Sequence, residues 1–271
     1  MDEESFSLDG MFTPPRPPTP PPTLAIYQRE KARGTGGGWS EIGISLVGNH
    51  PLWGHYLWNA SRAFASFLDS NRLLYVGRTV LELGAGGGLP GILAAKNGAR
   101  KVVLTDYPDA PLIDNLRKNV EENLREEERI RVSVLGYTWG HPVESLLQEL
   151  VDADSRSQPD GFDVVIMSDL VFNHSQHDAL LDACELSLSS RRGDAATDGS
   201  EPCLLAFYSH HRPHLAEHDL GFFRKAEARG WLCKEIVTEK FTPMFPEDPG
   251  EEEVRATVHG WKLTRGATKN A

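Results

Sequence analysis

The most constraining feature of this chain is the run from Val80 to Gly91, where an apolar strand passes into a turn made almost entirely of glycine. The pattern predicts a strand over Thr79–Leu83 and a helix from about Pro90. Glycine permits positive φ and lets a ligand approach the main chain closely. The first N–H groups of a helix lack intrahelical partners, and proline costs little in the first turn. A strand, glycine turn and helix in this order predict a nucleotide or nucleoside pocket.

The spacing of the glycines narrows the choice of ligand. A dinucleotide site of the form G-x-G-x-x-G starting at Gly84 would need a glycine where Leu89 stands. The Lys-Ser/Thr pair of a phosphate-binding P-loop is also missing. Glu82 would repel a pyrophosphate, but it suits a ligand with a free amino group and a sulfonium charge. Asp106 ends the next expected strand, Lys101–Thr105, where a carboxylate can accept both ribose hydroxyls.

The whole pattern, Glu82-x-Gly84-x-Gly86-x-Gly88 followed by Asp106, resembles motif one of the S-adenosylmethionine-dependent methyltransferases. A glycine-rich turn in some other α/β protein is the alternative. The two acids at these spacings favour the methyltransferase interpretation.

Charge and composition limit the partners. The 271-residue chain has a formal net charge of −11, which disfavours a nucleic-acid substrate but is compatible with a basic protein partner. No stretch is long and apolar enough to span a bilayer, and the acidic N-terminus lacks the apolar core of a signal peptide. The three widely spaced cysteines are expected to be reduced. We therefore expect a cytoplasmic monomer without membrane or nucleic-acid partners.

Four regions follow from composition. Residues 1–25 are predicted to form a disordered tail, since seven of the ten residues from Thr13 to Pro22 are proline. Residues 26–78 are predicted to cap a Rossmann-like core over residues 79–265, and residues 266–271 to form a second disordered tail. Strands and helices alternate through the core, which favours a parallel sheet, and two consecutive strands at the end suggest an antiparallel hairpin.

The remaining elements are predicted as follows. Helices are expected over Asn59–Ser70, Pro90–Asn97, Pro108–Arg125, Pro142–Val151, Ser175–Leu188 and Leu215–Ala228, and further strands over Arg131–Leu135, Phe162–Ser168, Cys203–Ser209, Trp231–Lys240 and Val254–Thr264.

Three more side chains fit the same pocket. Trp139 follows the third core strand, where an indole can stack on adenine. Trp58 lies upstream of the core, and a folded-over N-terminal segment would bring it to the methionine arm of the ligand. Ser168 ends the fourth core strand, beside the glycine turn. The alternatives are core positions for the two tryptophans and a helix-capping role for the serine.

These motifs together resemble the seven-β-strand protein lysine methyltransferases over about residues 26–265. The order of motifs and the phrase Gly-Asn-His-Pro-Leu-Trp-Gly-His-Tyr-Leu-Trp, ending at Trp58, are similar to one fungal branch. That branch methylates the N-terminal α-amine and adjacent lysine of translation elongation factor 1-alpha. The resemblance implies an α/β fold with a Rossmann-like seven-stranded sheet and a C-terminal antiparallel hairpin. It also implies S-adenosyl-L-methionine as cofactor, bound by Trp58, Gly84, Ala85, Gly86, Asp106, Trp139 and Ser168. Thr138 departs from the family, which commonly has an acid before the Trp-Gly pair.

The family's acidic D/E-x-x-Y/F motif after the fourth strand is matched by Asp169 and Phe172. We expect Asp169 to orient the target amine and Phe172 to wall the methyl channel; capping of the following helix is the alternative for Asp169. His210 or His211 is a candidate for a place near the substrate. No metal site is expected, although His214 and His218 would share a helix face.

Two other functions stay open at this point. One is methylation of a small amine such as nicotinamide, for which a closed pocket would speak. The other is a non-catalytic module that holds the cofactor. The acidic run Glu247–Glu253, in the predicted terminal hairpin, could attract a basic protein tail, whereas a solvated loop is the ordinary interpretation.

Overall fold

The computed structural model describes residues 21–30, 38–48, 50–52, 54–151, 160–191 and 201–266. Most of the two predicted tails therefore lies outside the described residues. The elements, in chain order, are β1 (Thr23–Gln28), β2 (Glu41–Leu46), α1 (Asn59–Ser70), η3 (Arg72–Leu74), β3 (Thr79–Leu83), α2 (Leu89–Lys96), β4 (Lys101–Asp106), α3 (Ala110–Asn123), α4 (Glu126–Arg129), β5 (Val132–Gly136), α5 (Glu144–Gln148), β6 (Val164–Ser168), η4 (His174–Gln176), α6 (His177–Ser187), β7 (Cys203–Ser209), η5 (Pro213–Leu215), α7 (Ala216–Asp219), α8 (Gly221–Ala228), β8 (Trp231–Lys240), α9 (Glu252–Ala256) and β9 (Thr257–Arg265).

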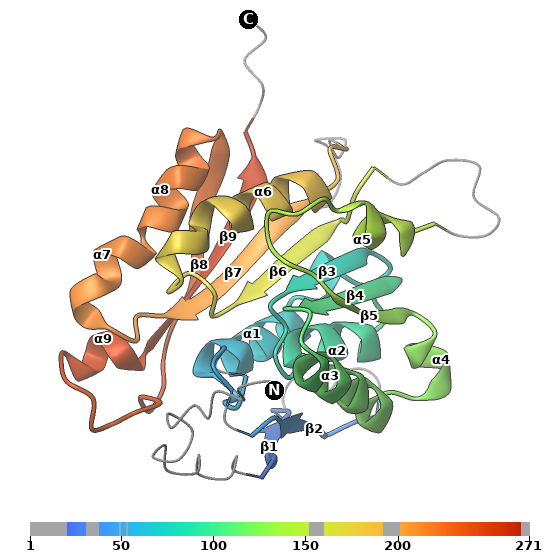
Figure 1. Ribbon diagram of the computed structural model, residues 1–271, viewed down its shortest axis with the longest axis horizontal. Helices are drawn as coiled ribbons and strands as arrows, with labels where there is room; N and C mark the ends of the chain where they lie inside the picture. Colours follow the sequence, from blue (N-terminus) through green and yellow to red (C-terminus); the bar gives the residue numbers. More distant parts are fainter. Residues whose placement is uncertain are drawn as a thin grey trace, which may run out of the picture.

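Seven strands form one sheet in the order β5-β4-β3-β6-β7-β9-β8 (Figure 1). The first five are parallel, whereas β9 runs antiparallel to both β7 and β8. The chain winds outward from β3 to β5 and then returns to place β6 on the other side of β3. Ligands of open α/β sheets bind at the carboxyl ends of the strands where the winding reverses. The predicted fold class is confirmed, including the terminal hairpin.

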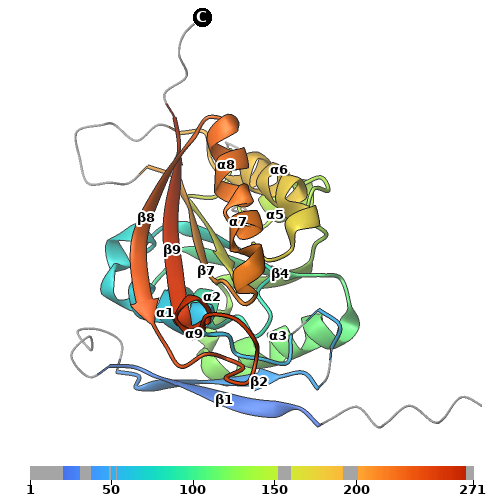
Figure 2. The ribbon, with the colours of Figure 1, turned by 90° about the vertical axis from the view of Figure 1, so that its left-hand side faces the viewer.

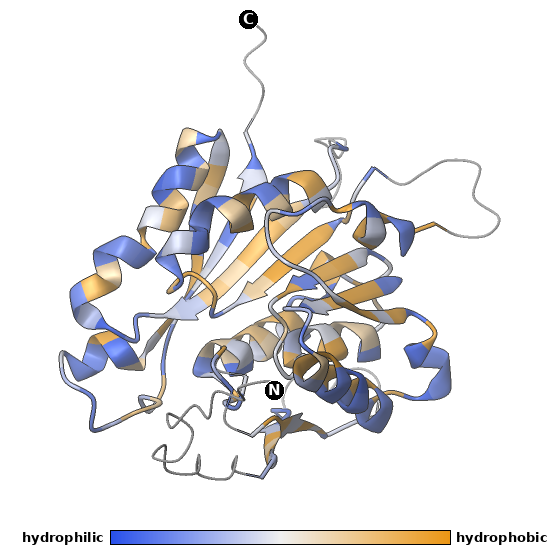
Figure 3. Cartoon of the chain, in the orientation of Figure 1, coloured by the Kyte–Doolittle hydropathy of each residue, from blue (hydrophilic) through white to orange (hydrophobic). Residues whose placement is uncertain are grey.

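Helices cover both faces of this sheet. Side chains along each central strand alternate between two buried clusters, so that in β3 Val80 packs on one face and Leu81 on the other. Helices α1, α2 and α3 cover the first face, and α5, α6 and α8 cover the second (Figure 1). Burial on both faces explains why the central strands are apolar throughout, as the orange strands in Figure 3 show.

A second, two-stranded sheet lies apart from the first, on the side of α3 (Figure 2). It is the antiparallel pair β1 and β2, which the sequence analysis did not predict. Because β1 begins at Thr23, the end of the predicted tail over residues 1–25 belongs to this hairpin. Its edge is tied to α1 through a buried ion pair, in which Arg29 Nε lies 2.7 Å from Asp69 Oδ2.

Several predicted boundaries were wrong. The helix predicted over Pro108–Arg125 ends at Asn123, and the one predicted over Leu215–Ala228 is divided among η5, α7 and α8. The last strand starts at Thr257, because residues 252–256 form α9. Ends of elements depend on local capping, which sequence periodicity does not report. None of the described helices is long and apolar enough to cross a membrane.

Candidate active site

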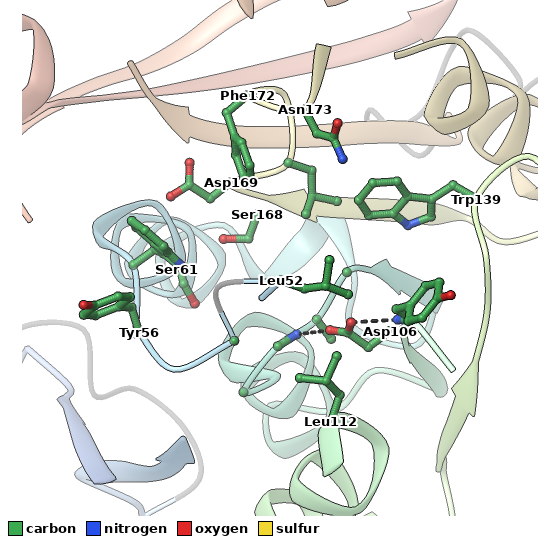
Figure 4. Close-up of a pocket in the computed structure, with 18 of the residues that line it drawn as sticks. Leu52, Tyr56, Ser61, Asp106, Leu112, Trp139, Ser168, Asp169, Phe172 and Asn173 are labelled. Carbon is green, nitrogen blue, oxygen red and sulfur yellow. Dashed lines mark hydrogen bonds between the residues drawn. The ribbon is translucent and has the colours of Figure 1, made fainter. Parts of the chain in front are cut away.

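A cavity of about 580 Å³ lies at the carboxyl ends of β3, β4 and β6, where the winding of the sheet reverses (Figure 4). It brings together nine of the ten residues that the sequence predicted for the site; these are Trp58, Gly84, Ala85, Gly86, Asp106, Trp139, Ser168, Asp169 and Phe172. Sequence reasoning missed other lining residues, among them Tyr56, Ser61, Leu112, Asn173 and Gln176. Tyr56 stands in the phrase that ends at Trp58, but nothing in the pattern singled out its side chain or those of the other four.

The glycine turn forms one wall of the cavity. Gly84 and Gly86 have φ values of +59° and +55°, which residues other than glycine rarely adopt. A Cβ atom built on Gly86 would meet no other atom within 4 Å, so the main chain there borders open space. The turn therefore offers a bare backbone surface to a ligand, as predicted.

Asp106 stands at the end of β4 and closes this turn. Its Oδ2 accepts a hydrogen bond of 2.6 Å from Gly86 N, and its Oδ1 accepts one of 2.7 Å from Tyr107 N. Burial raises the pKa of Asp106, although these two backbone hydrogen bonds act in the opposite direction. Each carboxylate oxygen has a second lone pair, so the group can still accept hydroxyl donors from the cavity.

Glu82 does not line the cavity, and its predicted role as a ligand contact was wrong. It faces α2 and is fully buried, and its Oε2 accepts a hydrogen bond of 2.9 Å from Gly91 N. An N–H that the sequence analysis expected to be free at the start of α2 is thereby used. Burial raises the pKa of Glu82 to about 8. Glu82 thus stabilises the glycine turn from inside the protein, by joining β3 to the start of α2.

Ser168 supplies a polar atom that the protein leaves unsatisfied. Its Oγ is buried, has no hydrogen-bond partner among the described residues and borders the cavity (Figure 4). Trp139 lies across from it, with its indole 3.2 Å from where a Cβ of Gly84 would be. Buried hydroxyls normally have partners, so a polar ligand is expected to complete this one. The bare turn, the Ser168 hydroxyl without a partner and the Asp106 carboxylate can together hold a nucleoside. Its adenine would lie against the apolar wall that includes Trp139.

Asp169 adopts a strained backbone conformation directly after β6. Its φ is +60°, which is uncommon outside glycine and clusters at functional sites. The side chain is 3% exposed, and Oδ1 and Oδ2 lie 3.0 and 2.9 Å from His211 Nε2. The following 3₁₀ turn has no side-chain cap, so the alternative role of helix capping is not what the structure shows.

His211 is therefore the partner of Asp169, a pairing that the sequence analysis did not predict; it proposed only that His210 or His211 lies near the substrate. Burial alone would lower the pKa of His211, but the adjacent Asp169 carboxylate and its hydrogen bond outweigh burial, so the net pKa is raised. The imidazole also packs edge-on against Trp58, with ring centroids 4.7 Å apart. The pair joins the predicted catalytic acid to the aromatic wall of the cavity.

Phe172 occupies the boundary of the cavity and is 40% exposed. Its role as a wall of the methyl channel stays a prediction. Among the described residues, no group of three or more His, Cys, Asp or Glu side chains is arranged to hold a metal ion.

Comparisons with known proteins show which family this chain is similar to. Residues 48–192 match the model of a family described as lysine methyltransferases. Two protein N-terminal and lysine N-methyltransferases, from Cryptococcus neoformans var. neoformans serotype D and Schizosaccharomyces pombe, are each 41% identical to this chain. The alignments cover 97% of this chain, and 90% and 98% of those relatives.

Solved structures share the fold at low sequence identity. The candidate RNA methyltransferase PH1948 from Pyrococcus horikoshii superposes with a TM-score of 0.51 at 18% identity, covering 82% of this chain and 90% of that one. SMU.776, a candidate methyltransferase complexed with SAH, superposes with a TM-score of 0.52 at 12% identity, covering 82% and 53%. These likenesses concern the fold alone.

Proposed function

Since this chain belongs to the lysine methyltransferase family, together with the protein N-terminal and lysine N-methyltransferases, we propose that it methylates the N-terminal α-amine and adjacent lysine of translation elongation factor 1-alpha, with S-adenosyl-L-methionine as donor. The cavity carries the proposal, because it joins a bare glycine turn, Asp106 and the orphaned Ser168 hydroxyl to the Asp169–Phe172 motif. The choice of elongation factor is supported by the resemblance of residues 48–58 to the fungal branch.

Each cavity residue has a role in this proposal. Asp106 accepts the ribose hydroxyls, the backbone of Gly84–Gly86 supports the ligand, and Trp139 covers the adenine. Trp58 borders the methionine arm, and Ser168 donates or accepts one hydrogen bond. The bound cofactor supplies an electrophilic methyl group on a sulfonium.

The acceptor must be a neutral amine. An α-amine with a pKa of about 7.7–8.0 is partly neutral near pH 7, whereas a lysine with a pKa of about 10.4 is almost fully charged. Asp169 orients the amine by accepting a hydrogen bond from it, and His211 holds the Asp169 carboxylate in place. Alignment of the reacting groups supplies several kcal/mol of barrier lowering in such reactions. We also propose a cytoplasmic monomer, as the sequence predicts.

The test incubates the purified protein with S-adenosyl-L-methionine and recombinant elongation factor 1-alpha whose N-terminus is free. We expect peptide mass spectrometry to find methyl groups on the α-amine and adjacent lysine. Asp169→Asn should lower the rate by about 10²-fold or more, as expected for a positioned polar group, while calorimetry shows unchanged affinity for S-adenosylhomocysteine. Methylation of nicotinamide but not of the factor would reject the proposal.

A further inference from the structure

A second cavity, of about 140 Å³, adjoins the cofactor cavity, and the function proposed above gives this cavity no role. The two cavities share Trp58 and Phe172 as a common wall. The other walls come from the segment after β7, which contributes His211, and from the loop between β8 and β9, which contributes Phe245 and Asp248. A group in the second cavity would therefore meet a ligand of the first across these two aromatic side chains.

The walls are aromatic. Phe245 packs edge-on against Tyr56 at 5.2 Å between ring centroids, and it lies 6.1 Å from Trp58 at an interplanar angle of 72°. Tyr56 in turn packs edge-on against Trp58 at 5.4 Å. Aromatic faces attract ammonium groups, including methylated ones that have lost N–H donors. The walls suit an amine both before and after methylation.

The second cavity is also acidic. Asp219 is buried in its lining, where His174 Nε2 and His210 Nδ1 lie 2.6 and 2.7 Å from its two carboxylate oxygens. Asp248 is exposed, lines the cavity and belongs to the acidic run Glu247–Glu253. Arg212 also lines the cavity. Two carboxylates against one arginine leave an excess of negative charge in the lining, which favours a cationic ligand.

The loop that brings Phe245 and Asp248 is held to the rest of the molecule. Asn59 Nδ2 donates a hydrogen bond of 2.8 Å to Thr242 O, which joins the loop to the start of α1. Arg255 Nη1 donates to the carbonyl oxygen of Phe245 at 2.5 Å. Since hydrogen bonds hold its backbone at Thr242 and at Phe245 itself, the loop presents that ring in a defined place.

We propose that the second cavity admits the acceptor amine, and that Phe245 and Asp248 select an unblocked protein N-terminus followed by basic residues. Phe245 packs beside Trp58 and forms part of the aromatic lining, and Asp248 attracts the positive charge of the segment that follows the amine. This inference rests on the proposed function and deepens it, because it names the chemistry by which the substrate is recognised.

The test measures peptide binding by fluorescence anisotropy with saturating S-adenosylhomocysteine. Two decapeptides with free α-amines are alike except that, after the first residue, one carries two lysines and the other two glutamates. We expect the wild-type protein to prefer the basic peptide, and acetylation of its α-amine to weaken binding. Phe245→Ala should weaken binding of the basic peptide about threefold to tenfold. Asp248→Lys should remove the preference, and 0.5 M salt should reduce it in the wild-type protein.

Leu232→Ala on β8 and Glu227→Gln on α8 are matched controls at exposed positions, and they should bind both peptides like the wild-type protein. Calorimetry should show that all variants bind S-adenosylhomocysteine within about twofold of the wild-type affinity. Equal wild-type binding of the two peptides, or a preference that survives Asp248→Lys, would overturn the inference. If the peptide preference holds while elongation factor 1-alpha stays unmethylated, the choice of substrate protein fails and the acceptor cavity stands.

Discussion

At the scale of single residues, the turn is supported by a carboxyl group in an unfavourable environment. Glu82 is fully buried, and its pKa of about 8 lies well above the ordinary 4.5. Between these two values the unfolded chain loses the proton while the folded chain keeps it. The free energy of unfolding contributed by this group therefore falls as pH rises from 4.5 to 8 and then levels off.

Glu82→Gln should remove this pH dependence. The amide oxygen can still accept the hydrogen bond from Gly91 N, and Oε1 of the native side chain has no partner that an amide would lose. We expect the variant to exceed the wild-type free energy of unfolding by a margin that grows from pH 5 to pH 8, reaching about 1–3 kcal/mol. Urea unfolding at pH 5, 6.5 and 8 measures the margin, and a constant margin would show that Glu82 does not titrate in this range.

The pair of Asp169 and His211 makes a prediction of the same sign, because the folded pKa of His211 is also raised. The raised pKa of His211 means that its contribution to stability is complete below its ordinary pKa of 6.5 and is lost as pH rises through the folded value. Asp169→Asn removes the charge but leaves the burial, so the pKa of His211 should fall below that of the wild-type protein. Proton NMR of the imidazole resonances follows it, and an unchanged titration would mean that the carboxylate does not control the histidine.

At the scale of elements, asparagine side chains on α3 form hydrogen bonds with the backbone of β2, as a neighbouring strand would. Asn119 Oδ1 accepts from Ser45 N at 2.8 Å, and its Nδ2 donates to Ser45 O at 2.9 Å and to Gly87 O at 3.0 Å. Asn123 Oδ1 accepts from Gly43 N at 3.1 Å, and its Nδ2 donates to Gly43 O at 2.7 Å. The helix thus binds the cap hairpin and, through one side chain, the glycine turn.

Replacement of Asn119 should test this connection. Asn119→Ala removes the hydrogen-bond partner of Ser45 N and of Gly87 O, whereas Ser45 O keeps its bond from Asn115 Nδ2, and we expect a loss of about 2–4 kcal/mol in the free energy of unfolding. Asn115→Ala is the matched control on the same helix, because Asn115 gives one hydrogen bond, to Ser45 O. Equal losses in the two variants under urea would contradict a special role for Asn119.

At the scale of the whole molecule, the cofactor cavity is assembled from the N-terminal cap, the ends of three central strands and the loop after β6. A ligand there should stabilise the chain as one unit. S-adenosylhomocysteine at about 100 times its Kd should add about 2.7 kcal/mol, or about 5–10 °C in Tm. Calorimetric scans should show a smaller shift for Asp106→Ala at the same concentration, and a larger shift with a nicotinamide dinucleotide would refute the site assignment.

The sequence predicted those features that depend on local pattern. The glycine turn and the acid at the end of β4 follow from spacing within a short segment. The parallel core follows from the alternation of strands and helices along the chain. The predicted ligand contact of Glu82 was wrong because its spacing to Gly84 does not reveal which face of the sheet its side chain occupies. Glu82 lies on the same face of β3 as Val80, toward α2, whereas Leu81 and Leu83 lie on the other face. The hairpin of β1 and β2, Phe245 and Asp219 were also missed, since only long-range packing brings them to their places.

The hairpin has a consequence for how the chain is made. Ser45 meets Asn119 across 74 positions of sequence. During synthesis the hairpin leaves the ribosome long before α3 exists, and an isolated two-stranded pair is at best marginally stable in water. Its open edge must then wait without its partner, where other nascent strands can add to it. The edge of β2 is thus covered only once α3 has been synthesised and has folded against it.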